Sequence, residues 1–112
     1  HFIKNIDSNK FITDIDIEGQ SNYAFIVIMK DKSFELRDKV ELVLKDKGIE
    51  FRRGLSGGGN QLRQPYFKKY YNIDLDEFKN TDHIHHFSWY VGNYPCLEQD
   101  KIDFLIQTLN NI

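Results

Sequence analysis

The sequence has 112 residues, a net charge of −2, and 40% hydrophobic and 14% aromatic residues. This length fits one domain with a single core, and the apolar content excludes a disordered chain. No apolar run approaches the ~18 residues of a membrane span, and the charge provides no basic field for nucleic acid. The single Cys96 cannot form an internal disulfide. We therefore expect a soluble, cytoplasmic domain that binds neither a membrane nor nucleic acid.

Residues 1–21 scatter apolar side chains weakly among polar ones, which predicts a tether into a domain formed by residues 22–112. Residues 23–29 are an almost unbroken run of apolar, aromatic and β-branched side chains, typical of a buried strand. Residues 33–47 predict a helix, with Asp31 or Ser33 as the N-cap and Gly48 just past its end. The apolar positions at helical spacing are Leu36, Val40, Val43 and Leu44.

The second half predicts shorter elements. Residues 49–53 indicate a second strand and residues 85–91 a third, while residues 98–110 carry the spacing of a final helix. Residues 65–71 and 74–79 favour helical turns, with an Asp suited to capping before the second. This order predicts an α+β fold, with a small sheet of about three strands and helices on one face.

A glycine-rich loop, residues 54–61, separates the second strand from the helical turns, because three consecutive glycines support no regular element. It lacks the Gly-Lys-Ser/Thr of a phosphate loop and the Gly-x-Gly-x-x-Gly spacing of a dinucleotide site. Arginine suits bidentate capture of carboxylate or phosphate, and the amides of Asn and Gln can orient a ligand. The flanking residues are Arg52, Arg53, Asn60, Gln61, Arg63 and Gln64. They favour a ligand-contacting loop over a solvated one, which stays the alternative.

Three other features permit a functional or a structural interpretation. His83, His85 and His86 could suggest a metal, but on a strand only His83 and His85 would share a face, and zinc needs three or four ligands. We therefore expect structural or substrate-facing histidines and no metal site. We expect Cys96 to be a buried, inert thiol. The aromatic residues of the last strand could stack on RNA, but their pattern favours a core.

Two stretches before the closing helix have a recognisable pattern. Residues 48–66 contain R-R-G-L-S-G-G-G-N-Q-L-R-Q-P, and residues 89–95 read W-Y-V-G-N-Y-P. From about Asn22 onward the chain resembles the C-terminal domain of DegT-type nucleotide-sugar aminotransferases, which are PLP-dependent enzymes of fold type I. Within that family it is most similar to the 3-dehydratases of nucleotide-linked 4-keto-6-deoxy sugars, the GDP-4-keto-6-deoxy-D-mannose 3-dehydratases. The first stretch is specific, whereas the strand, turn and closing helix are common to the wider family.

The resemblance implies an N-terminal domain, outside this chain, that carries PLP or PMP on a Lys or a His. It implies a cytoplasmic homodimer that takes a nucleotide-linked keto-deoxy sugar and glutamate, for lipopolysaccharide O-antigen synthesis. It implies no catalytic residue here, so this chain alone would be inactive and its glycine loop mobile. The implied substrate- or glutamate-binding residues are Arg63, Arg53, Asn60, Gln61 and Ser56, with Arg52, His85 and His86 as further candidates.

One alternative belongs to a different class of function. The same arginines could serve a freestanding regulatory domain that binds an anion or another small molecule without catalysis. A reading frame that continues upstream with a PLP-binding pattern would favour the enzyme, whereas a gene that begins near His1 would favour the regulatory domain.

Overall fold

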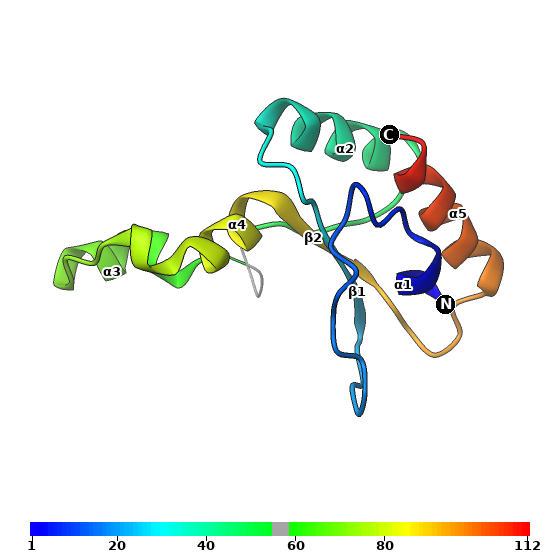
Figure 1. Ribbon diagram of the computed structural model, residues 1–112, viewed down its shortest axis with the longest axis horizontal. Helices are drawn as coiled ribbons and strands as arrows, with labels where there is room; N and C mark the ends of the chain where they lie inside the picture. Colours follow the sequence, from blue (N-terminus) through cyan, green and yellow to red (C-terminus); the bar gives the residue numbers. More distant parts are fainter. Residues whose placement is uncertain (55–58) are drawn as a thin grey trace.

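The structure, a computed structural model, describes residues 1–54 and 59–112 and shows helices around a two-stranded sheet (Figure 1). The strands are antiparallel, with Phe25 opposite Val91 and Val27 opposite Trp89. The predicted α+β class is confirmed. The elements are α1 (Phe2–Asn5), β1 (Ala24–Ile28), α2 (Phe34–Asp46), η1 (Gln61–Arg63), α3 (Pro65–Tyr70), η2 (Leu75–Phe78), α4 (Lys79–Phe87), β2 (Ser88–Gly92) and α5 (Gln99–Asn110).

The core forms on one face of this sheet, against α2 and α5. Alternate residues of a strand point to opposite faces, so Val27 and Trp89 enter the core while Ile26 on the other face is 44% exposed. The helices contribute residues at helical spacing, as their sequences predict. The residues that the two long helices contribute to this buried cluster are Val40 and Leu44 of α2 and Leu105, Ile106 and Leu109 of α5.

The two long helices confirm their predictions because their signals are local. The Ser33 hydroxyl accepts a hydrogen bond from the Leu36 N–H at 3.1 Å, which satisfies one of the unpaired donors at the start of α2. Gly48 follows the helix with φ +68°, a conformation that glycine adopts without strain. At the other end of the chain, α5 begins at Gln99, with Glu98 at its N-cap position.

The predicted strand over residues 49–53 is wrong in its extent. Only Arg52 pairs, through a single antiparallel bridge to Tyr90 in which each N–H donates to the other residue's carbonyl, at 3.1 and 3.0 Å. Gly48 and Gly54 both have positive φ and turn the chain at either end of this short segment. Arg53 meanwhile bonds Glu41 of α2. The described sheet therefore has two strands rather than three.

The predicted strand over residues 85–91 begins too early. Residues 85–87 complete α4, and β2 begins at Ser88. The Ser88 N–H and hydroxyl both donate to the Ile84 carbonyl, the hydroxyl at 2.6 Å, which closes the last helical turn and releases the chain into the strand. The smaller predictions hold: α3 begins at Pro65, and the Asp74 carboxylate accepts from the Asp76 N–H at 2.9 Å.

The N-terminal segment packs onto the domain, since Phe2, Ile6 and Phe11 are buried in the same core and Phe11 bridges to Met29. Its role as a tether to a further domain stays a prediction. Among the helices that the structure describes, none has both the length and the apolarity to cross a membrane.

One part of the molecule projects away from the core, as Figure 1 shows for α3. We call residues 61–87, which comprise η1, α3, η2 and α4, the arm, and its base is the C-terminal end of α4, where Phe87 enters the core. The Cα radius of gyration is 15.1 Å, whereas a compact domain of this size has about 13 Å. The difference reflects the arm, whose end carries exposed Tyr66, Tyr70 and Tyr71.

Candidate functional site

The two ends of the glycine loop meet beside His85, at the C-terminal part of α4. Gly54 has φ +66°, and a Cβ added there would lie 3.4 Å from the His85 carbonyl oxygen. A Cβ added to Gly59 would overlap the Gly54 carbonyl, 2.8 Å from its carbon, and would lie 3.3 Å from His85 Nδ1. We call this junction of Gly54, Gly59, Asn60 and His85 the neck of the loop. Residues 55–58 lie outside the described residues. They include the predicted site residue Ser56 and the part of the glycine loop to which the expectation of mobility applies.

Asn60 fixes the neck and is 1% exposed. Its N–H donates to His85 Nδ1 at 3.0 Å, its side-chain oxygen caps η1 by accepting from the Leu62 N–H at 3.0 Å, and its amide donates to Asp82 at 3.4 Å. The first bond requires an unprotonated His85 Nδ1. Burial, followed by the charges of His86 and Arg63, lowers the pKa of His85 and favours this neutral ring.

Arg63 and Asp82 form a bidentate ion pair across the arm, from η1 to α4. Arg63 Nε donates to one carboxylate oxygen of Asp82, and Nη2 donates to the other at 2.7 Å. Planar pairs of this kind are among the stronger charge-assisted contacts. The hydrogen bond from Arg63 is the main cause that lowers the pKa of Asp82 to about 2. His86 Nε2 lies 3.8 Å from the second oxygen, so Asp82 lies between the Arg63 guanidinium and the His86 ring.

This pair predicts a loss of stability in acid. The pKa of Asp82 is about 2 in the fold against an ordinary 3.8, so this group binds fewer protons in the folded state than in the unfolded chain. The stability that the pair contributes is therefore complete above pH ~4. It should disappear as pH falls from about 4 to about 2, and partial solvent exposure limits it to about 1–2 kcal/mol. Urea unfolding across this range should show that Asp82→Asn flattens this part of the profile. An equally steep acid loss in both proteins would contradict the pairing.

Arg53 enters the loop from the other side and is held by the core. Its Nε donates to Glu41 of α2, and the Trp89 indole N–H donates to the same oxygen at 3.0 Å. Burial alone would raise the pKa of Glu41, but the hydrogen bonds from Arg53 and Trp89 outweigh it and the pKa is lowered. Glu41 therefore stays ionised and links the start of the loop to the buried tryptophan.

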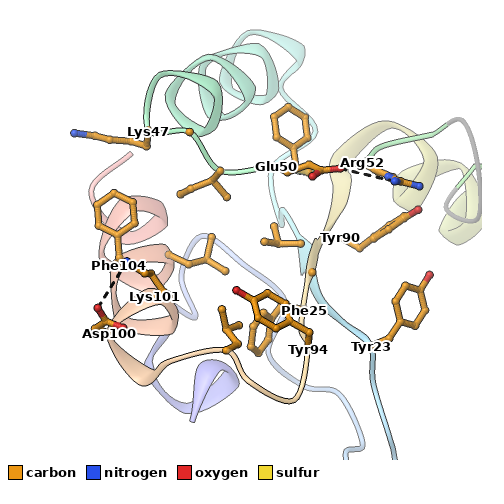
Figure 2. Close-up of a pocket in the computed structure, with 17 residues that line it drawn as sticks. Tyr23, Phe25, Lys47, Glu50, Arg52, Tyr90, Tyr94, Asp100, Lys101 and Phe104 are labelled. Carbon is orange, nitrogen blue, oxygen red and sulfur yellow. Dashed lines mark ion pairs between the residues drawn. The ribbon is translucent and has the colours of Figure 1, made fainter.

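Arg52 and Gln61 lie outside this network. Figure 2 shows Arg52 at the rim of a cavity of about 940 Å³ that Tyr23, Tyr90 and other aromatic residues line. Its side chain is 60% exposed and its contact with Glu50 is 3.7 Å long, so it is the least constrained of the three arginines near the loop. Gln61 is exposed and bonds the Tyr66 hydroxyl.

The structure corrects two interpretations. His83, His85 and His86 lie on a helix rather than a strand and contact different polar partners, with His83 Nε2 bonding the Met29 carbonyl at 2.7 Å. Among the described residues, no three His, Cys, Asp or Glu side chains gather as a metal site requires. Cys96 is exposed rather than buried, because it lies in the turn after Pro95 that leaves the sheet. The core interpretation of the aromatic residues is confirmed for Trp89 of β2, which is 2% exposed, and for Phe87, which is 5% exposed but ends α4 rather than lying in the strand.

The network thus joins Arg63, Asn60, His85 and His86, four of the predicted residues, and places Arg53 at the loop entrance. Two carboxylates that are not among the predicted residues complete these contacts, Asp82 within the network and Glu41 at Arg53. Asp82 precedes His86 by four residues, which places the two side chains on the same face of a helix. A helix predicted over these residues would therefore have indicated that Asp82 lies beside His86. Glu41 carries no comparable signal, because its partners are 12 and 48 residues away.

Comparison with known proteins supports the fold and gives one distant relative. No model of a known protein family matches the chain. The lipopolysaccharide biosynthesis protein RfbH of Salmonella typhimurium is 30% identical over 84 residues, which are 75% of this chain and 19% of that protein. The structure of the putative sugar aminotransferase Spr1654 from Streptococcus pneumoniae, in its PMP form, superposes with a TM-score of 0.63 at 15% identity. The superposition covers 79% of this chain and 21% of that one, so the chain spans about a fifth of each protein.

Proposed function

We propose that the chain is the C-terminal small domain of a cytoplasmic, homodimeric PLP-dependent enzyme that acts on nucleotide-linked 4-keto-6-deoxy sugars. The proposed reaction is 3-dehydration, as in GDP-4-keto-6-deoxy-D-mannose 3-dehydratase, with transamination as the alternative. The fold shared with a sugar aminotransferase and the similarity to a lipopolysaccharide biosynthesis protein support this. The observation that carries it is the guanidinium of Arg63, which already holds a carboxylate in bidentate geometry beside the glycine loop.

In this proposal Arg63 binds a carboxylate of glutamate, and Arg53 is the second candidate for a carboxylate or phosphate. Asn60, Gln61 and Ser56 orient the substrate or the loop. Arg52, His85 and His86 are further candidates for contact. We assign no catalytic residue to this chain. PLP or PMP would supply the amino-group chemistry and would be held by a part of the polypeptide outside these 112 residues.

The test is Arg63→Ala in the complete polypeptide. Losing a charge-assisted hydrogen bond costs on the order of 1.5–3 kcal/mol, so the regeneration of the pyridoxamine form by glutamate should slow by about 10- to 150-fold while the domain stays folded. Stopped-flow absorbance of the glutamate half-reaction measures this rate. Lys68→Ala, which removes an exposed cation from the same arm, is the matched control and should react like the native enzyme. Unchanged kinetics in Arg63→Ala would remove Arg63 from the site.

One observation favours the regulatory alternative. The cluster around Asp82 is assembled from residues of this chain alone, with Asn60, Arg63 and His86 all in contact. An anion-binding domain could therefore act without a catalytic partner. Sequencing upstream of His1 separates the two proposals, because only the enzyme requires a continuous reading frame with a PLP-binding pattern.

A further inference from the structure

We infer that Asp82 is a positioning residue that holds the Arg63 guanidinium in the orientation that receives a ligand carboxylate, an inference that rests on the proposed role of Arg63. The two residues lie 19 positions apart and belong to different elements, η1 and α4. Their bidentate contact fixes both the position and the plane of the guanidinium, whereas a single hydrogen bond would leave the plane free to rotate.

The contact uses only one edge of the guanidinium. Arginine has five N–H donors in a fixed plane, and Asp82 engages the Nε–H and one N–H of Nη2. The opposite edge, formed by Nη1 and the other N–H of Nη2, makes no hydrogen bond to any residue in 1–54 or 59–112. That edge has the spacing for a second, end-on carboxylate. The Arg63 side chain is 31% exposed, so it is open to solvent.

Asp82 is itself held, which allows it to fix its partner. Its carboxylate accepts from the Asn60 amide at 3.4 Å and lies 3.8 Å from His86 Nε2. Asn60 in turn is anchored by its backbone N–H to His85. The orientation of Arg63 is therefore tied to α4 and to the neck of the loop together.

A different role for the same contact makes the opposite prediction. If Asp82 instead occupied Arg63 as an internal competitor, removing its charge would free the guanidinium and tighten the binding of a carboxylate. Asp82→Asn also makes the site more positive, which by itself favours an anion. Weaker binding in Asp82→Asn would therefore run against both competition and electrostatics, and only the loss of orientation explains it.

The experiment uses the 112-residue chain and L-glutamate as the probe. Backbone amide shifts of the arm in ¹H–¹⁵N spectra give the glutamate Kd for the native chain, Asp82→Asn, Asp82→Glu and Arg63→Ala. The ¹H–¹⁵N NOE of the Arg63 Nε–H reports whether the side chain is held, and the glutamate Kd is the readout that a merely structural ion pair would leave unchanged in the folded molecules. Asp76→Asn, an exposed carboxylate on the same arm, is the control for charge.

We expect Asp82→Asn to weaken glutamate binding about three- to tenfold, the effect of having to immobilise a free, rotamer-rich side chain on binding. The Arg63 Nε–H should become mobile in the same variant. Asp82→Glu keeps the charge but displaces the carboxylate by one methylene. Its affinity for glutamate should therefore fall between those of the native chain and Asp82→Asn. Asp76→Asn should bind like the native chain.

Three outcomes would overturn the inference. If Arg63→Ala abolishes binding but Asp82→Asn binds as tightly as the native chain or more tightly, Arg63 keeps its role and Asp82 does not position it. If the native chain and Arg63→Ala respond to glutamate alike, including no response from either, both the inference and the role of Arg63 fail. If Asp82→Asn does not fold, Asp82→Glu decides, and unweakened binding with an altered Arg63 resonance overturns the inference.

Discussion

Alanine at position 59 is expected to open the neck of the glycine loop and to lower the free energy of unfolding by about 3 kcal/mol, the upper part of the range for overpacking. The new Cβ would overlap the Gly54 carbonyl and would press on His85 Nδ1 at 3.3 Å. Neither neighbour is the end of a flexible side chain, because one is backbone and the other is the acceptor for the Asn60 N–H. The chain must therefore move at the neck, and the bond from Asn60 to His85 should break.

Urea unfolding measures the stability, and the ¹⁵N shift of His85 Nδ1 reports the hydrogen bond. Gly92→Ala is the matched control, since nothing lies within 4 Å of an added Cβ there and its φ is not positive. A compatible Gly→Ala change stabilises a protein by about 0.4–1 kcal/mol, so Gly92→Ala should be neutral or slightly stabilising. Equal stability of the two variants would show that the neck does not close in solution.

Leu109→Ala should lower the free energy of unfolding by about 3–4 kcal/mol. Leu109 is 0% exposed and lies in the cluster that joins α5 to α2 and the sheet. The effect combines the lost transfer of the side chain from water with the cavity that remains. Alanine is at least as good a helix former as leucine, so the backbone of α5 adds no penalty.

Leu42→Ala is the control for this substitution, because Leu42 lies in α2 and is 59% exposed. It should change stability by no more than about 0.5 kcal/mol. Urea unfolding of both variants gives the comparison. A loss of the same size in both would mean that α5 does not contribute the core that the structure shows.

How closely an element can be predicted depends on how local its sequence signal is. Ser33 and Gly48 mark the ends of α2 within the helix itself, so this element was predicted nearly to the residue. In contrast, residues 85–87 predict a strand because their apolar and aromatic neighbours resemble one. Their helical state depends on remote contacts, such as His85 with Asn60, and on the Ser88 bonds that close the turn.

The same distinction applies to the candidate site. Residue type identified the arginines and Asn60, because guanidinium and amide groups near a glycine-rich loop indicate ligand contact. Residue type could not reveal that Arg63 pairs with Asp82, or Arg53 with Glu41, across separations of 19 and 12 residues. These pairings depend on how the arm and α2 meet the loop, which only the assembled fold determines.

The hydrogen bond between Trp89 and Glu41 also gives the molecule an internal optical reporter. Trp89 is the one tryptophan in the sequence and is 2% exposed, so its emission should be shifted to the blue in the native state and move to the red on unfolding. Its indole N–H shares a carboxylate oxygen with Arg53. Tryptophan fluorescence excited at the red edge of the absorption band would therefore report structural changes at the entrance of the glycine loop without any added label.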